Sequence, residues 1–195
     1  MKLLGNKLPE LITERLELRL PRTGDYGQWS ALRESSRSFL EPWEPTWMSD
    51  HLTRKSFSER VRWARKSTED GFAVPFFLLR HDDGVLVGGI TVDQIRLGPA
   101  QKASIGYWIG EPFARLGYMK EAIEALVHHA FCEMDLSRIE AACLPTNTAS
   151  RKLLEKTGFK YEGVAQSYLQ IHGRWQNHVL YANLRSDRRG RTDAG

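Results

Sequence analysis

The hydrophobic and polar positions along the chain predict short strands separated by amphipathic helices. Residues 16–20 alternate strictly between apolar and polar side chains, which is typical of a strand with one buried face. The apolar runs at 72–80 and 85–92 flank an Asp-Gly turn, so they predict a hairpin. A second hairpin is expected near the end of the chain, where 159–171 and 178–184 flank a His-Gly turn.

The clearest helix signal lies near the middle of the chain. Met119, Ile123 and Leu126 begin a series of apolar residues at intervals of three and four, which predicts a helix over 121–134. Residues 103–110 are rich in β-branched and aromatic side chains and predict a largely buried strand before it. The remaining elements are expected as helices at 26–34, 51–70 and 147–156 and as a strand at 138–144. Helices bracketed by strands, with a closing hairpin, are typical of one mixed sheet rather than of two domains.

A basic loop with a central glycine connects the middle strand to the middle helix. The start of a helix leaves several backbone N–H groups without partners, at the positive end of the helix dipole. Gly117 allows the main chain to approach a pyrophosphate closely, and Arg115 and Lys120 add positive charge beside it. These features predict an anion-binding loop, although an ordinary strand-to-helix turn would use the same glycine.

Several segments carry a resemblance to a known family. The run Arg115-Leu-Gly-Tyr-Met-Lys-Glu-Ala122, placed after a strand, resembles the acetyl-CoA pyrophosphate loop of the GNAT superfamily of N-acetyltransferases. Asn147-Thr-Ala-Ser150, followed by residues 153–159, resembles the next signature of that superfamily. Similarity to the branch that acetylates the N-terminal alanine of ribosomal proteins is found at 13–19, 39–45, 161–163 and 168–180.

The resemblance runs from about residue 11 to residue 184 and implies a GNAT-like fold. That fold is a single domain of mixed α/β (α+β) class, whose central, mostly antiparallel mixed sheet has about seven strands flanked by about four helices. The acetyltransferase domain is then expected at 11–184, with an N-terminal extension at 1–10 and a basic flexible tail at 185–195.

The resemblance also implies the chemistry. Acetyl-CoA is the expected co-substrate, no metal is expected, and a primary amine attacks the thioester directly; the acceptor implied is the N-terminal alanine of a ribosomal protein. Main-chain N–H groups of 107–109 would stabilise the oxyanion where the strand separates from its neighbour. The implied cofactor-binding residues are Trp108, Ile109, Arg115, Leu116, Gly117, Tyr118, Met119, Lys120, Asn147, Ser150 and Lys156.

Asn147 and Ser150 are the implied catalytic residues. Asn147 would hydrogen-bond the pantetheine or the acceptor, and Ser150 would serve as an acid or as a water anchor. The same pair also has the pattern of a helix cap, in which the Asn side chain satisfies a free N–H group. Both roles can hold together.

An aromatic segment is expected on the acceptor side. Residues 39–48 contain two prolines and three aromatic side chains, which is incompatible with a regular helix or a central strand. Its tryptophans could simply fill the core, but the resemblance favours a loop that shapes the mouth of a substrate cleft. Phe39, Trp43 and Tyr168 are therefore the expected substrate-binding residues.

The chain departs from the family pattern at several positions. Ala114 and Met119 make the loop pattern incomplete, a tyrosine that acts as the acid in several relatives would fall at Leu154, and a glutamate used by a sister branch would fall at Leu169. No general base therefore transfers by resemblance. Because an α-amine titrates near ~8 and lysine near ~10.4, an N-terminal acceptor needs little deprotonating power.

A water molecule could still relay a proton to a carboxylate. Glu41, Glu44 and Asp93 are the candidates, but each is expected as a solvated surface charge.

Composition sets the remaining limits. The 195-residue chain has a formal net charge of +4, which suits an anionic cofactor. No apolar run approaches the ~18 residues of a membrane span and the first residues do not resemble a signal peptide, so a cytoplasmic protein is expected. Cys132 and Cys143 lack metal-ligand spacing and are expected as reduced core residues. The expected partners are acetyl-CoA and a protein N-terminus, without direct nucleic-acid reading or membrane binding, and the chain is expected as a monomer or a homodimer.

Two other functions stay open. The fold also hosts enzymes that acetylate small amines such as aminoglycosides or polyamines. The departures at Ala114 and Leu154 leave room for a non-catalytic, acyl-CoA-binding module that associates with the ribosome or regulates another protein.

Overall fold

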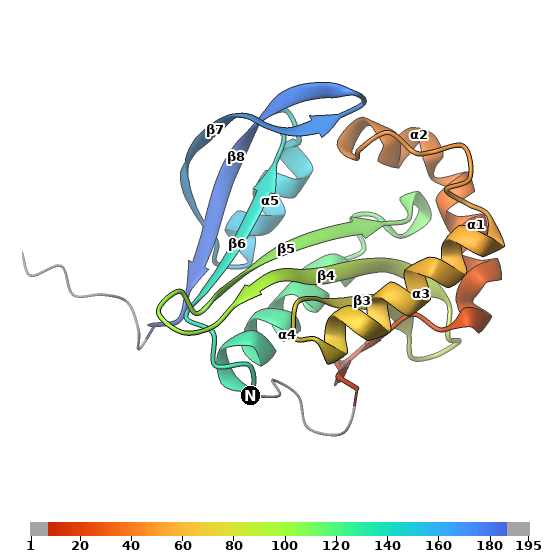
Figure 1. Cartoon of the computed structure of the whole chain (residues 1–195), viewed down its shortest axis with the longest axis horizontal. Coiled ribbons are helices and arrows are strands. Elements are labelled where there is room, and N and C mark those ends of the chain that lie inside the picture. Colours follow the sequence, from red (N-terminus) through yellow and green to blue (C-terminus); the bar gives the residue numbers. More distant parts are fainter. Residues whose placement is uncertain (1–7, 187–195) are drawn as a thin grey trace, which may run out of the picture.

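A twisted sheet forms the centre of the molecule and carries helices on both faces (Figure 1). The computed structural model describes residues 8–186, and within them the sheet has eight strands in the order β1-β2-β3-β4-β5-β6-β8-β7. Neighbouring strands are antiparallel except for β5 and β6, which are parallel. The strands are β1 Glu10–Ile12, β2 Leu16–Arg19, β3 Val74–Arg80, β4 Leu86–Arg96, β5 Lys102–Ile109, β6 Arg138–Cys143, β7 Lys160–Ile171 and β8 Arg174–Leu184.

Five α-helices occur in the described part of the chain. They are α1 Tyr26–Ser35, α2 Arg37–Leu40, α3 Arg54–Glu69, α4 Tyr118–Cys132 and α5 Thr148–Lys156, and short 3-10 turns lie at Thr23–Asp25, Glu41–Trp43 and Glu111–Phe113. The predicted fold class is confirmed. Two small elements were not expected: β1 has only three residues, too few for alternation to appear, and α2 ends just before Pro42.

Strand β3 shows how the two faces are built. Every residue from Val74 to Leu79 is buried, as expected for a strand covered on both sides. Phe76 and Leu78 belong to the larger core cluster with the apolar face of α4, whereas Phe77 and Leu79 belong to a second cluster with α1 and α3. Each such side chain contributes about 1.5–3 kcal/mol through burial. The sheet therefore separates a face covered by α4 from a face covered by α1 and α3.

The parallel strands β5 and β6 pair over only part of their length. Their register runs from Lys102 opposite Arg138 to Ile105 opposite Ala141. Beyond that point β5 continues to Ile109 and stays paired with β4 on its other edge. The main chain of 106–109 therefore turns one edge toward the opening between β5 and β6.

The hairpin of β7 and β8 closes around a two-residue turn. His172 and Gly173 both have positive φ, of 54° and 73°, as the predicted tight turn requires. The tip of this hairpin reaches toward α2 (Figure 1). A Cβ atom placed on Gly173 would lie 4.0 Å from Oγ1 of Thr46, so the tip adjoins the loop that follows α2.

The expected terminal segments are covered only in part. Residues 1–7 of the predicted extension and 187–195 of the predicted tail lie outside the described residues. Arg185, where the tail was expected to begin, forms an ion pair with Asp135 at 2.9 Å. Among residues 8–186, none of the helices has both the length and the apolar composition needed to cross a membrane.

Candidate active site

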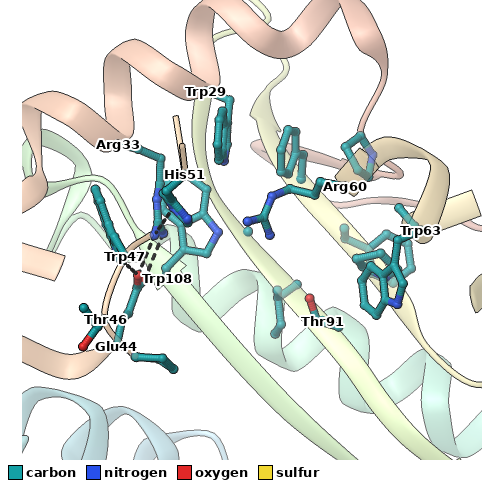
Figure 2. Close-up of a pocket in the computed structure, with 18 residues that line it drawn as sticks. Trp29, Arg33, Glu44, Thr46, Trp47, His51, Arg60, Trp63, Thr91 and Trp108 are labelled. Atoms are coloured by element: carbon teal, nitrogen blue, oxygen red, sulfur yellow. Dashed lines mark hydrogen bonds and ion pairs between the residues drawn. The ribbon is translucent and has the colours of Figure 1, made fainter. Parts of the chain in front are cut away.

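An aromatic pocket lies on the face of the sheet that α1 and α3 cover (Figure 2). Its volume is about 390 Å³, and its walls include Trp29 from α1, Trp63 from α3 and Trp108 from β5. Glu44, Thr46 and Trp47 come from the loop after α2, and His51, Arg33, Arg60, Gly89 and Thr91 also line it. Because β5 alternates between the two faces, Trp108 points into this pocket while its neighbour Tyr107 packs on the α4 face.

One wall of the pocket is formed by an ion pair that packs against indole rings. The Arg33 guanidinium donates to both carboxylate oxygens of Glu44, and the Trp47 indole N–H donates to Glu44 Oε2 at 2.8 Å. Arg33 also lies between two indoles, 4.3 Å from the ring centre of Trp47 and 4.9 Å from that of Trp108. The Arg33 side chain is 6% exposed, so this wall is a largely buried ion pair held between aromatic faces.

His51 completes this wall. Its ring stacks on Trp47 with 4.6 Å between ring centres, and its Nε2 lies 3.3 Å from Arg33 Nη2. Burial, together with the positive charges of Arg33 and Arg60, lowers the pKa of His51 to about 4. The imidazole is therefore neutral at pH 7.

The loop before α4 has the geometry expected for anion binding on the opposite face. Gly117 caps the helix with φ of +87°, a left-handed conformation that glycine adopts without steric cost. The first hydrogen bond of the helix runs from Glu121 N to Gly117 O, so the amides of residues 118–120 have no acceptor within the helix. The amide edge and the helix dipole together fit a pyrophosphate.

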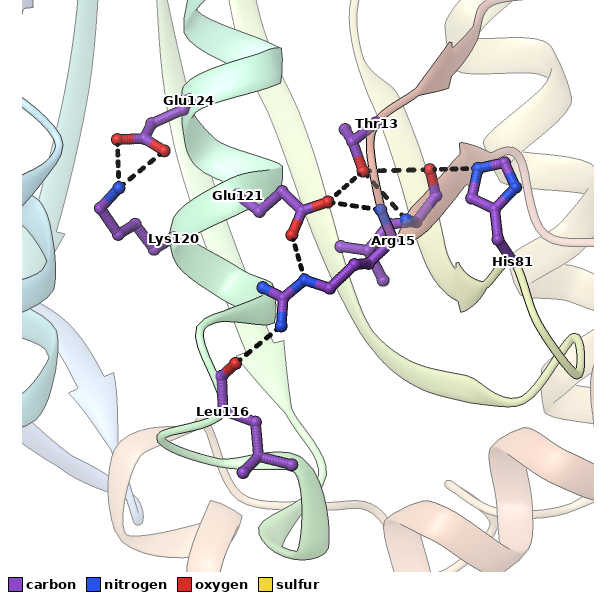
Figure 3. Close-up of polar contacts among 8 residues, drawn as sticks. Thr13, Arg15, His81, Leu116, Lys120, Glu121 and Glu124 are labelled. Atoms are coloured by element: carbon purple, nitrogen blue, oxygen red, sulfur yellow. Dashed lines mark hydrogen bonds and ion pairs between the residues drawn. The ribbon is translucent and has the colours of Figure 1, made fainter.

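The turn after β1 holds this loop in place (Figure 3). Arg15 donates to the Leu116 carbonyl at 3.0 Å and to Glu121 Oε2 at 2.7 Å, and its guanidinium lies 4.6 Å from the ring centre of Tyr118. Thr13 donates to Glu121 Oε1 at 2.6 Å. Burial acts to raise the pKa of Glu121, but these hydrogen bonds and the Arg15 charge outweigh it, so that pKa lies below its usual range.

The side chains predicted to bind the cofactor differ in their exposure and in their partners. Lys120 forms an ion pair with Glu124 at 2.7 Å, one turn along α4, and Met119 is buried in the core. Arg115 and Leu116 are exposed, as is Lys156 at the end of α5. Arg115 is therefore the exposed cation beside the main-chain amides, whereas Lys120 is paired within its helix.

The start of α5 faces the opening between β5 and β6. Asn147 caps the helix, because its Oδ1 accepts from Ser150 N at 3.0 Å. The Ser150 hydroxyl lies 2.8 Å from the Tyr107 hydroxyl, so one hydrogen bond joins β5 to α5 across the opening. Burial raises the pKa of Tyr107 well above its usual value, which keeps the phenol protonated. Sequence reasoning missed Tyr107; the alternation of 103, 105 and 107 was the available signal.

The predicted acceptor residues do not line the pocket. Phe39 is half-buried, and Trp43 and Tyr168 are exposed, all outside the lining set. The 39–48 stretch contributes to the pocket through residues 44–47 instead. The expectation that this stretch shapes a cleft stays a prediction, with Trp47 as the aromatic side chain in position to do so.

The carboxylates expected as surface charges behave differently. Glu44 is only 22% exposed, and both its oxygens accept hydrogen bonds, from Arg33 and Trp47. Asp93 is half-buried, and its Oδ1 has no hydrogen-bond partner among residues 8–186; burial raises the pKa of Asp93. Glu41 is half-buried and paired with Arg37 at 3.1 Å. The surface-charge prediction is therefore wrong for Glu44 and Asp93.

Other predicted positions have structural roles. Leu154 is fully buried in the core and has no group that could donate a proton, whereas Leu169 is 47% exposed on β7. Cys143 is buried as expected, but Cys132 is exposed, so its assignment to the core is wrong. Within the described residues, no group of three or more His, Cys, Asp or Glu side chains is placed to hold a metal ion.

Comparison with known proteins agrees with this architecture. Residues 15–160 match the family model described as an acetyltransferase (GNAT) domain. The [ribosomal protein uS5]-alanine N-acetyltransferase of Escherichia coli is 31% identical over 172 residues, covering 88% of this chain and 89% of that protein. The ribosomal-protein-serine acetyltransferase of the same organism is 27% identical over 147 residues, covering 71% and 80% of the two chains.

A solved structure extends the match to three dimensions. Mycobacterium smegmatis RimJ in complex with CoA-disulfide superposes with a TM-score of 0.84 at 30% identity, covering 94% of this chain and 89% of that one. The family model spans most of the sheet and both helix starts described above. The chain therefore belongs to the GNAT family and is an N-acetyltransferase.

Proposed function

We propose that the protein transfers the acetyl group of acetyl-CoA to the N-terminal amine of a ribosomal protein, with alanine as the first residue of the acceptor. The observation that carries the transfer step is the partial pairing of β5 and β6, which ends at Ile105 opposite Ala141; the acceptor is proposed from the 31% identity to the [ribosomal protein uS5]-alanine N-acetyltransferase of Escherichia coli. Beyond Ile105, the main chain of β5 faces an opening that has an anion-binding helix start on one face of the sheet and the aromatic pocket on the other.

Acetyl-CoA, the acetyl donor, fits the α4 side of this opening. The amides of residues 118–120 would bind the diphosphate, and the pantetheine would extend along the free edge of β5. The structure of RimJ from M. smegmatis holds CoA as a disulfide, which supports a CoA site in this family member as well. The exposed Arg115 side chain would add positive charge beside the diphosphate.

The acceptor amine would attack the thioester carbonyl directly. The C–N bond forms first, main-chain N–H groups of 107–109 stabilise the tetrahedral oxyanion that develops, and the C–S bond then breaks as the thiolate leaves. One such donor typically lowers the barrier by ~3 kcal/mol. Ser150 would give its hydroxyl proton to the thiolate and regain one, through water, from the attacking nitrogen, which loses a proton as the amide forms; Tyr107 holds the serine hydroxyl in place.

The amine itself needs little activation. The free amine of a protein N-terminus titrates near ~8, so a useful fraction is neutral at pH 7. Turnover is expected to rise with one apparent pKa, close to that of the acceptor amine. A second, enzyme-borne pKa near ~6 would instead indicate a general base.

A peptide panel tests the proposal. Short peptides that begin with Ala, Ser or an acetylated Ala are incubated with acetyl-CoA, and released thiol is followed together with peptide mass. Acetylation at the free N-terminus of the Ala peptides supports the proposal. Turnover of aminoglycosides or polyamines without peptide turnover would point to a small-molecule enzyme, and CoA binding without any thiol release would point to a non-catalytic module.

Asn147 offers a matched test of the catalytic assignment. Asn147→Ala removes both the cap and any contact with substrate, whereas Asn147→Asp keeps a capping carboxylate. If Asn147 contacts the pantetheine or the acceptor, both variants lose turnover while only the Ala variant loses stability. Full turnover in the Asp variant would restrict Asn147 to the cap.

A further inference from the structure

Arg60 is a cation of the aromatic pocket without an acidic partner in the described part of the chain. It extends from α3 into the pocket, where its guanidinium lies 5.4 Å from the ring centre of Trp29 (Figure 2). Within residues 8–186, no hydrogen bond or ion pair joins its side chain to another residue. Arg60 is exposed as a residue, but the protein packed around its guanidinium and then the nearby Arg33 charge lower the pKa of Arg60, an effect that Glu44 offsets only in part.

The carboxylate in the pocket does not supply the missing partner. Glu44 Oε1 accepts from Arg33, and Glu44 Oε2 accepts from both Arg33 and Trp47. The pocket lining therefore holds two guanidinium groups against one carboxylate, and His51 is neutral at pH 7. The excess charge lies at Arg60.

The walls around Arg60 strengthen its attraction for an anion. Trp29 and Trp63 lie beside it, and Pro75 and Phe77 of β3 also line the pocket. Trp63 is 47% exposed, so these walls displace only part of the water around Arg60; where they do, the lower local dielectric increases the interaction between opposite charges. A guanidinium fork matches a carboxylate in geometry and can bind it through two parallel hydrogen bonds.

The pocket also adjoins the point of acetyl transfer. Trp108 lines the pocket and is the residue after Tyr107, whose hydroxyl meets Ser150 at the opening between β5 and β6. An extended peptide advances about 3.3 Å per residue. An acceptor whose amine enters this opening would therefore place the side chains of its second to fourth residues near the pocket.

We propose that Arg60 binds an acidic side chain of the acceptor, an Asp or Glu within the first few residues behind the reacting amine. The inference rests on the proposed transfer to a protein N-terminus and adds a specificity-determining contact to it. The bond is a charge-assisted hydrogen bond, and one of these is worth about a tenfold change in affinity.

Peptide binding tests this contact without requiring turnover. Ala-Glu-Gly-Gly, Ala-Gly-Glu-Gly and Ala-Gly-Gly-Glu, each with an amidated C-terminus, are titrated with and without CoA against their Gln counterparts, and tryptophan fluorescence reports occupancy of the pocket. At least one Glu peptide should bind about tenfold more tightly than its Gln match. Equal affinities for every pair would overturn the inference.

Variants of α3 assign the preference to Arg60. Arg60→Gln should remove the preference for Glu, and Arg60→Lys should keep part of it because the charge remains. Arg62→Gln is the matched control, since Arg62 lies on the same helix with its side chain 77% exposed and does not line the pocket. A Glu preference that persists in Arg60→Gln, with normal circular dichroism, would contradict the inference.

The same peptides separate this inference from the function on which it rests. If none releases thiol from acetyl-CoA, the proposed transfer fails, but the fluorescence titration still reports whether Arg60 selects a carboxylate. If all are acetylated with equal kcat/KM and equal affinity, the proposed transfer holds and the Arg60 contact does not.

Discussion

The two faces of β5 build their binding sites by different means. On the α4 face, the groups proposed to bind the diphosphate are main-chain amides beside Gly117, and side chains such as Arg15 and Glu121 hold that main chain in place. On the opposite face, the aromatic pocket is made of side chains, with Arg33 and Glu44 packed between indole rings. The donor site should therefore be sensitive to backbone conformation, and the acceptor site to the loss of single side-chain groups.

The largest loss of stability is expected in the aromatic pocket, on the face where the acceptor is proposed to bind, when Glu44 is replaced. Glu44→Gln removes the charge that neutralises Arg33, whose side chain is 6% exposed, and leaves a cation between two aromatic rings. Breaking a pair of this kind costs about 3 kcal/mol in the free energy of unfolding, measured by urea denaturation. The folded fraction should still bind CoA normally but should have a higher KM for the acceptor.

Glu34→Gln is the matched control for this variant. Glu34 pairs with Arg37 at 2.7 Å on the surface, where both side chains are largely solvated. Exposed ion pairs contribute little to stability, so this variant should unfold like the parent protein. Equal losses in the free energy of unfolding for Glu34→Gln and Glu44→Gln would show that the ion pair in the pocket wall stabilises the protein no more than a surface pair does.

The second prediction addresses the main chain of the donor face. Gly117→Ala places a Cβ atom in a left-handed residue, 3.2 Å from Arg15 Nη2, beside the amides that would hold the diphosphate. Unfolding should become easier by about 1 kcal/mol, and calorimetry should show CoA affinity reduced by about tenfold. Gly98→Ala has a similar backbone strain, with φ of +70° in open space, and should lose stability without losing CoA affinity.

The two faces also differ in how much of each could be predicted from the sequence. The donor loop lies within one continuous segment, because a strand, a glycine and an amphipathic helix follow one another between 103 and 134. Local pattern was therefore enough to predict the start of α4, whereas the anion-binding role of its first amides stays a prediction. The ties from Thr13 and Arg15 to Glu121 were not predictable, since they join residues more than 100 positions apart.

Most of the aromatic pocket could not be predicted from the sequence. Its residues come from α1, the loop after α2, α3 and three strands, and only the folded sheet brings them together. The spacing of Trp29 and Arg33, four residues apart on one helix face, was the available local signal. Glu44 was assigned to the surface because a lone carboxylate between two prolines gives no sign of a buried arginine partner.

The third prediction concerns the hydrogen bond that crosses the opening between the two sites. Tyr107→Phe keeps the ring in the core but removes its bond to Ser150. A neutral hydrogen bond contributes about 1 kcal/mol, so kcat should fall by about fivefold if Tyr107 positions Ser150. In a double-mutant cycle with Ser150→Ala, the two effects should be far from additive. Additive effects would indicate that the two hydroxyls act separately; Tyr161→Phe, exposed on β7, is the control.

The smallest effect at pH 7 is expected from a pH dependence confined to the aromatic pocket. His51 has its pKa lowered from 6.5 to about 4 in the folded protein, so between these values the unfolded chain binds a proton that the folded chain does not. The contribution of His51 to stability is therefore complete above about pH 6.5 and is lost as the pH falls through about 4.

The free energy of unfolding of His51→Gln should depend less steeply on pH in this window than that of the parent protein. His172→Gln, in the exposed turn between β7 and β8, sets the baseline for replacing a histidine. Because CoA would bind on the other face, its affinity should not follow the titration of His51, and a parallel pH dependence of CoA binding would show that the two faces are coupled.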